Sequence, residues 1–162
     1  MQRASFRDMN CSIAQCLEVI GEWWTILILR DVFFGVTRFD ELQGRLGISR
    51  NILNDRLNRL VEEDVLEKVP YQAHPPRYDY RLTKKGRALW PVLTTMRQWG
   101  DDWAVGDAGK PVELLHTTCG HRTTAVLHCA DCGERLAGRD LRLRAGPGAG
   151  EDSVLPDELT RA

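Results

Sequence analysis

The segment Arg38-Phe-Asp-Glu-Leu-Gln-Gly-Arg-Leu46 places its apolar residues at the spacing of an amphipathic helix, and Gly47-Ile48 interrupts that pattern. Ser49 then stands where an N-cap is expected, and helical periodicity resumes from Arg50 to Glu63. Two short helices joined by a Gly-containing turn, the second of them basic, predict a helix-turn-helix. The apolar face of the second helix is expected to consist of Ile52, Leu53, Leu57, Leu60 and Val61.

The opposite face of this second helix carries side chains that suit contacts with DNA. At about 100° per residue, Asn and Asp side chains cluster there with an Arg at each flank. Asn can pair with adenine, and Arg can pair with guanine or hold phosphates. A solvated surface helix is the alternative, but Asn is a poor helix former that stability alone would not select. The predicted contact residues are Ser49, Arg50, Asn51, Asn54, Asp55, Asn58 and Arg59.

A β-hairpin is predicted directly after the second helix. Val65 to Tyr71 is rich in apolar residues, and Arg77 to Leu82 alternates with the period of two that strands show. The segment between them, residues 72–76, contains two Pro residues that would stiffen the turn. A hairpin in this position is a wing, whose tip can place an Arg in a narrow minor groove. We predict that His74 and Arg77 serve this role and that Lys84 and Lys85 hold phosphates.

Charge is distributed unevenly along the 162 residues. The whole chain has 22 Lys and Arg against 23 Asp and Glu, whereas residues 38–97 have 12 against 8. A basic region on a nearly neutral protein favours selective DNA binding over unspecific coating. Residues 144–162 are rich in Gly and Pro, with four acids and two Arg, and are predicted to be a disordered acidic tail.

Neither a signal peptide nor a membrane segment is expected. The longest apolar stretch, Trp23 to Leu29, is far shorter than the roughly 20 residues that cross a bilayer, and it is interpreted as a core helix that continues to about Phe34. The expected compartment is therefore the cytoplasm, where cysteines more often bind metal or sense oxidants than form structural disulfides.

Two further helices are expected to flank the helix-turn-helix and wing. One covers about Ser12 to Gly21, and the other runs from about Lys84, capped by Thr83, to Trp103. Pro91 predicts a kink or a split in the second of these helices. Its apolar residues suit either a dimer interface or the monomer core, and we favour a homodimer because one helix-turn-helix reads only a half-site. These apolar residues are Leu89, Val92, Leu93, Met96, Trp99 and Trp103.

Several sequence blocks also carry a family resemblance. They are Cys11, Ile20-Gly-Glu-Trp-Trp-Thr-Ile-Leu-Ile-Leu-Arg30, Phe34-Gly, Arg38-Phe-Asp-Glu-Leu, Ile48-Ser-Arg-Asn-Ile-Leu-Asn-Asp-Arg-Leu57 and Pro76-Arg-Tyr-Asp-Tyr-Arg-Leu-Thr-Lys-Lys-Gly86. Over about residues 10 to 104 the chain resembles the HxlR family of small bacterial winged-helix transcription regulators, which are related in fold to the MarR group. The resemblance implies a homodimer that binds a pseudo-palindromic operator. Some members of that family respond to electrophiles or oxidants through a Cys placed like Cys11, so the resemblance points to Cys11 as a sensor.

The segment from His116 to Gly133 predicts a metal site. Cys129-x-x-Cys132-Gly is a metal knuckle, and His116-x-x-Cys119-Gly has the same form with His as its first ligand. The two knuckles predict a zinc-ribbon-like appendage over 112–143, with a strand from Thr123 to Leu127 between them. His121 is the rival fourth ligand. The remaining alternatives are a catalytic dithiol, which normally needs a thioredoxin-like setting that is absent here, and unbound thiols.

The two remaining cysteines, Cys11 and Cys16, are five residues apart. In a helix they fall on different faces, so they cannot easily form an intrachain disulfide. Cys16 is interpreted as a small buried residue. Cys11 lies near a helix start, where the helix dipole lowers the pKa of a thiol, and it is our candidate redox sensor.

Taken together, these patterns predict a mainly α (α+β) fold: a winged helix-turn-helix with dimerisation helices over 1–105, then the appendage and the tail. An enzyme is not expected, because the sequence contains no phosphate loop, nucleophile elbow or metallohydrolase motif. The expected partners are operator DNA and a second copy of the chain, and the expected cofactor is structural zinc. The alternative function is a zinc-ribbon module that docks on the transcription machinery. The operator, the regulated genes and any effector are not specified by the sequence.

Overall fold

The computed structural model describes residues 5–150. It divides into two units: one contains the described residues up to Leu89 together with 145–150, and the other contains Trp90–Arg144. Most of the tail predicted over 144–162 lies outside the described residues.

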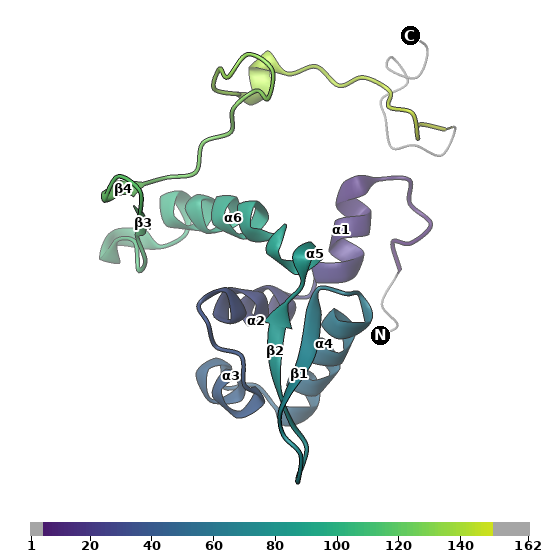
Figure 1. The fold of residues 1–162 in the computed structure, drawn as a ribbon. Coiled ribbons are helices and arrows are strands. Elements are labelled where there is room, and N and C mark those ends of the chain that lie inside the picture. Colours follow the sequence, from purple (N-terminus) through teal and green to yellow (C-terminus); the bar gives the residue numbers. More distant parts are fainter. Residues whose placement is uncertain (1–4, 151–162) are drawn as a thin grey trace. The chain divides into compact units, whose positions relative to one another are not determined.

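The first unit is a mixed α+β winged helix, as predicted, and Figure 1 shows its hairpin extending past α3 and α4. Among the described residues, its elements are α1 (Ser12–Ile20), α2 (Trp23–Phe33), α3 (Phe39–Leu46), α4 (Arg50–Glu62), β1 (Leu66–Gln72), β2 (Arg77–Leu82) and α5 (Lys84–Arg87).

The turn between α3 and α4 forms for the local reasons that the sequence suggests. Gly47 ends α3 with a φ of +64°, a left-handed conformation that costs glycine little. The Ser49 hydroxyl then accepts a hydrogen bond of 3.3 Å from the backbone N–H of Ile52, which satisfies one of the unpaired donors at the start of α4. The helix ends at Glu62, one residue before the predicted end.

The core of the first unit lies where α4 packs on α2 and α3. Leu53, Leu57 and Leu60 of α4 are fully buried, as are Ile28, Leu29 and Leu42 from the other two helices. The prediction was wrong for Ile52, whose exposed fraction is 39%. The buried stripe runs through positions 53, 57 and 60, and Ile52 lies about 100° away from its first residue around the helix.

The wing is an antiparallel pair in which Leu66 lies opposite Leu82 and Lys68 opposite Tyr80, with an irregularity between Pro70 and Gln72. The backbone N–H of Tyr80 donates to the carbonyl of Thr37 at 2.8 Å, just before α3 begins. This contact ties the wing to the helix-turn-helix and fixes its direction relative to α3.

The predicted split of the 84–103 helix is confirmed. Thr83 caps α5 by accepting a 3.0 Å hydrogen bond from the N–H of Gly86, and a separate helix α6 (Trp90–Trp103) begins in the second unit. Pro91 lies in the first turn of α6, where the lack of an N–H is tolerated.

The rest of the second unit has little regular structure. It contains the 3-10 turns Gly106–Ala108 and Gly138–Asp140 and a short hairpin of β3 (Leu114–His116) and β4 (His121–Thr123). The strand predicted from Thr123 to Leu127 was wrong, because β4 ends at Thr123. Beyond it, the N–H of Ala125 donates to Gln98 of α6 at 3.0 Å, so the chain leaves the hairpin to bond with the helix.

Within residues 5–150, no single helix is long and apolar enough to cross a bilayer. Only when taken together are helices α1 and α2 long and apolar enough, and they are bent by 77° at their junction.

Candidate nucleic-acid interface

The predicted reading face of α4 is accessible at its N-terminal end. Arg50, Asn51, Asn54 and Asp55 are exposed, while Asn58 is half-buried. The Asn58 side-chain oxygen accepts a 2.9 Å hydrogen bond from the ammonium group of Lys68 on β1. One end of the reading face is therefore open to a ligand, and the other end is joined to the wing.

A surface hollow of about 480 Å³ lies between α4, α3 and the wing. Its walls combine the donors and acceptors of α4 with aromatic rings and with the two prolines of the wing turn. The lining residues are Phe39, Asp40, Arg50, Asn51, Asn54, Tyr71, Pro75, Pro76, Arg77, Tyr78 and Tyr80. Predicted contact residues from the helix and from the wing therefore border one concave surface.

Asp40 joins the two arginines of this hollow. One carboxylate oxygen lies 3.1 Å from Nη1 of Arg50, and the other lies 3.7 Å from Nη1 of Arg77. The Arg50 guanidinium also donates to the side-chain oxygen of Gln43 at 3.1 Å and lies 4.8 Å from the centre of the Phe39 ring. Both arginine side chains are at least half exposed, so these contacts are weak enough to be exchanged for a phosphate.

The wing tip is braced by its own side chains. His74 is exposed at the turn, and the Gln72 amide donates to the carbonyls of His74 and Pro75 at 3.2 and 3.1 Å. Arg38, which the sequence did not single out, lies 4.6 Å from the Tyr71 ring centre and 3.6 Å from the Asp79 carboxylate. Helical periodicity does not show that Arg38, at the N-cap of α3, lies beside the wing. Its positive charge is the only feature of the sequence that could have marked it as a candidate DNA contact.

The two lysines after the wing differ in their surroundings. Lys84 is exposed, as a phosphate contact requires. The Lys85 ammonium instead donates to the backbone carbonyl of Glu63 at 2.5 Å, just past the end of α4. Lys85 therefore helps to hold α5 against the end of α4.

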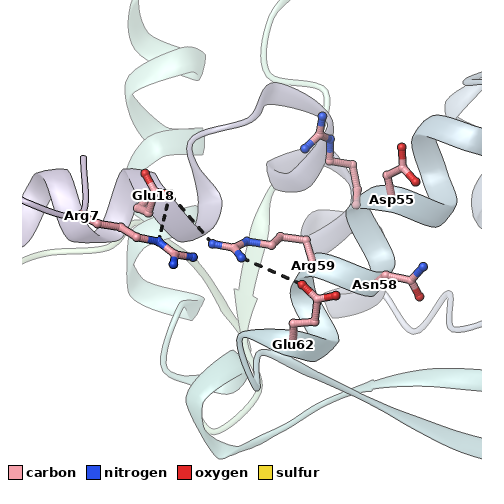
Figure 2. Close-up of a pocket in the computed structure, with 7 residues that line it drawn as sticks. Arg7, Glu18, Asp55, Asn58, Arg59 and Glu62 are labelled. Carbon is pink, nitrogen blue, oxygen red and sulfur yellow. Dashed lines mark ion pairs between the residues drawn. The ribbon is translucent and has the colours of Figure 1, made fainter. Parts of the chain in front are cut away.

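Arg59 occupies a different environment from Arg50, although both were predicted to flank the reading face. Its guanidinium pairs with Glu63 at 2.6 Å and also approaches Glu18 of α1 and Glu62 at 4.0 Å. Figure 2 shows the contacts of Arg59 with Glu18 and Glu62, and it shows that Glu18 also pairs with Arg7, at 3.5 Å. A second hollow, of about 460 Å³, is lined by Arg7, Glu18, Asp55, Arg56, Asn58, Arg59 and Glu62. Arg59 is thus engaged in contacts within the protein, which argues against the predicted phosphate contact.

Cys11 is the N-cap residue of α1, and its side chain makes no capping hydrogen bond. It is half-buried, as is Cys16 within the helix. The expected position of Cys11 at a helix start is confirmed, and Cys16 is less buried than expected.

The predicted metal ligands lie in two pairs. Nδ1 of His116 lies 3.2 Å from the Cys119 sulfur. The pKa of the Cys129 thiol is lowered by hydrogen bonds from the backbone of Cys132, then of Asp131, and from the Cys132 side chain. Across residues 5–150, no three His, Cys, Asp or Glu side chains already converge in a group that could hold a metal ion.

Comparisons with known proteins agree with this geometry. Residues 19–107 match the HxlR-like helix-turn-helix family. An HTH-type transcriptional regulator of Mycobacterium tuberculosis is 44% identical over 144 residues, which cover 89% of this chain and 91% of the relative. An HTH-type transcriptional regulator of Mycobacterium bovis shows the same identity and coverage.

Solved structures show the same similarity. The crystal structure of PA1607, described as a candidate transcription factor, is 40% identical with a TM-score of 0.78, covering 88% of this chain and all of that one. The reduced form of the redox regulator HypR is 28% identical with a TM-score of 0.54, covering 57% of this chain and 92% of that one.

Proposed function

The chain belongs to the HxlR-like helix-turn-helix family, and from that premise we propose that it binds a pseudo-palindromic operator as a homodimeric transcriptional regulator. In each half-site α4 enters the major groove, and the wing contacts the backbone and the adjacent minor groove. The observation that supports this proposal most strongly is the hollow between α4 and the wing, which Arg50, Asn54 and Arg77 border together.

The chemistry of this hollow suits a DNA strand. Asn51 and Asn54 present amides that can pair with the edge of adenine, and the two arginines present guanidinium groups that suit guanine or phosphate. In the DNA-free protein, Asp40 holds Arg50 and Arg77 through ion pairs of 3.1 and 3.7 Å. DNA phosphates would replace that carboxylate, so Asp40 sets the strength of unspecific binding by competing for both arginines.

The homodimer is proposed from exposed apolar side chains on two helices. On α1 the exposed fractions are 73% for Ile13 and 43% for Leu17. On α6 they are 55% for Met96, 65% for Trp99 and 77% for Trp103. On each helix separately, exposed apolar residues of this size are typical of a face that a partner covers. Half-sites about 10 base pairs apart, or a multiple of that spacing, would follow.

Redox control through Cys11 is the second candidate property. It is supported by the position of Cys11 at the N-cap of α1 and by the structural similarity to HypR, a redox regulator. If the property is present, Cys11→Ser should abolish any effect of the thiol oxidant diamide on DNA affinity. Oxidant-dependent DNA binding that persists in Cys11→Ser would exclude this role.

The test of the DNA-binding proposal measures the affinity of the full-length protein for the promoter region of its own gene over a range of salt concentrations. Arg50→Ala and Asn54→Ala should each weaken specific binding by about 1–3 kcal/mol. Lys84→Ala should weaken specific and unspecific DNA about equally, because phosphate contacts carry no sequence information.

Two matched variants sharpen this test. Arg59→Ala removes an arginine from the same helix but from the internal ion-pair group, so it should affect affinity much less than Arg50→Ala does. Asp40→Asn removes the competing carboxylate and should tighten binding to unspecific DNA. Unchanged operator affinity in Arg50→Ala would show that α4 is not the reading helix. A complete lack of salt-dependent DNA binding would favour the protein-docking alternative.

A further inference from the structure

We propose that residues 112–143 bind one structural zinc ion through His116, Cys119, Cys129 and Cys132. This site lies outside the DNA-reading residues and does not depend on the proposed function. Residues 112–143 contain two turns with the same backbone structure, ligands at matching spacings in both turns, and no buried core.

The two candidate turns have the same backbone structure. In the first, the N–H of Gly120 donates to the carbonyl of His116 at 2.8 Å, and Gly120 has a φ of +72°. In the second, the N–H of Gly133 donates to the carbonyl of Cys129 at 3.0 Å, and Gly133 has a φ of +75°. Each bond thus joins the first and fifth residues of a turn, and the two candidate ligands occupy the first and fourth positions. The left-handed glycine at the fifth position reverses the chain, as a metal knuckle requires.

Short antiparallel pairings support both turns. The first turn connects β3 to β4, in which His116 lies opposite His121. The second lies within an isolated bridge between His128 and Arg135, where the N–H of Cys129 donates to the carbonyl of Glu134 at 2.8 Å. Two hairpins that each present a pair of ligands at the turn are the architecture of a zinc ribbon.

The ligand atoms within the first turn have nearly the separation that a zinc ion needs. Zn–N and Zn–S bonds of about 2.1 and 2.3 Å at a tetrahedral angle separate the two ligand atoms by roughly 3.5 Å. Nδ1 of His116 lies 3.2 Å from the sulfur of Cys119. A small side-chain adjustment would therefore suffice to place one ion between them.

The other histidines are less suited to be the fourth ligand. Nδ1 of His128 is within 2.9 Å of the Gly133 carbonyl and so already bonds to the second turn. His121 lies beyond Gly120 on β4, outside the first turn. Only His116 is in contact with the sulfur of Cys119 among the described histidines.

Residues 109–144 also have no hydrophobic core that could stabilise them without a metal ion. None of the described side chains in residues 109–144 is buried, and Leu115, Leu127 and Leu143 are each more than 60% exposed. A segment of this size without a core cannot offset the conformational entropy lost on ordering. Metal binding supplies such a segment with folding free energy.

The two pairs do not yet form one four-ligand group in the described residues, so the proposal includes a rearrangement. The nine residues between Cys119 and Cys129 connect the turns, and a shared ion would hold them together. On binding, the three thiols release their protons to solvent and coordinate Zn²⁺ as thiolates, while His116 coordinates as neutral imidazole. All four positions are then filled by protein, which makes the site structural.

The experiment uses full-length protein without a polyhistidine tag, purified anaerobically and analysed for metal by mass spectrometry. We expect about one zinc per chain. Replacing zinc with Co²⁺ should give the visible absorption of tetrahedral cobalt with thiolate-to-metal charge transfer. Cys119→Ser and Cys132→Ser should each abolish the tight site, and His116→Ala should weaken it more than His121→Ala does. The helical circular dichroism of each variant checks that the winged helix remains folded.

Four results would overturn the proposal or one of its ligands. Anaerobic protein that neither contains zinc nor binds added Zn²⁺ would exclude the site. Full zinc content in Cys119→Ser would show that the two turns do not share an ion. A Cys129–Cys132 disulfide found by mass spectrometry in protein prepared under reducing conditions would assign the second turn to redox chemistry. A larger loss in His121→Ala than in His116→Ala would overturn the assignment of the fourth ligand.

Discussion

The helix-turn-helix core and residues 109–144 differ in what holds them together. In the core, α2, α3 and α4 bury leucine and isoleucine side chains completely, and the ion pair of Arg45 with Asp31 connects α3 to α2. In residues 109–144 none of the described side chains is buried, and the strands are three residues long. The contrast teaches that the candidate DNA-reading surface rests on a self-sufficient core, whereas residues 109–144 have no buried side chains to hold them together.

The largest expected effect comes from the core. Leu57→Ala should lower the free energy of unfolding by about 2–5 kcal/mol, because Leu57 is fully buried in α4 and the change leaves a cavity. Urea unfolding followed by circular dichroism measures this loss. Leu141→Ala, at a position that is 56% exposed in the appended segment, is the matched control and should change stability by less than about 0.5 kcal/mol. Similar losses in the two variants would remove the contrast between the regions.

A smaller effect is expected from the buried carboxylate of Asp31. This fully buried group of α2 accepts a hydrogen bond of 3.0 Å from Nε of Arg30 and one of 3.3 Å from Nε of Arg45 on α3. Asp31→Ala should cost roughly 1–3 kcal/mol, since both arginines are partly exposed and can be rehydrated. Asp102→Ala removes the exposed pair with Lys110 in the second unit and should cost about 0–1 kcal/mol. Thermal unfolding of both variants would show whether ion pairs matter more in the core region.

The N-cap of the reading helix should contribute less. Ser49→Ala removes the acceptor for the N–H of Ile52 and should destabilise the protein by about 1 kcal/mol, whereas Ser49→Thr should retain most of the stability. Because the cap lies beside Arg50, DNA affinity should be measured together with stability. A neutral Ser49→Ala would mean that packing alone fixes the start of α4.

The smallest effect concerns alkaline pH. Burial, followed by the nearby charge of Tyr78, raises the pKa of Tyr80 on β2. The neutral phenol is therefore favoured in the folded state, and its contribution to stability is fully present below the ordinary tyrosine pKa of about 10 and is lost as the pH rises through the folded value. The wing should accordingly lose stability in strongly alkaline solution, and Tyr80→Phe should reduce the loss. An identical alkaline profile in wild type and Tyr80→Phe would show that another group is responsible.

Part of the candidate DNA-reading site could be predicted from the sequence. Of the residues that border the hollow, Arg50, Asn51 and Asn54 of α4 and Arg77 of the wing were predicted from periodicity and turn chemistry, which are properties of a few neighbouring positions. The tyrosines of the wing that also border it were not predicted as contacts. The roles of Asp40 and Arg38 were not predicted, because both depend on the approach of the wing to α3. The exposure of Ile52 was likewise missed, since the buried stripe depends on which side of α4 meets α2.

Sequence alone determined the local elements of this protein and its membership of a family. The Ser49 cap, the Gly47 turn and the break before Pro91 act within one helical turn, so a linear pattern specifies them. Only the tertiary structure decided how the charged side chains are used. Arg50 and Arg59 flank the same predicted face, yet one faces the hollow beside the wing and the other pairs with Glu63 and Glu18. Long, flexible side chains take the partners that packing brings within reach, and this selection is made between elements that are distant in the chain.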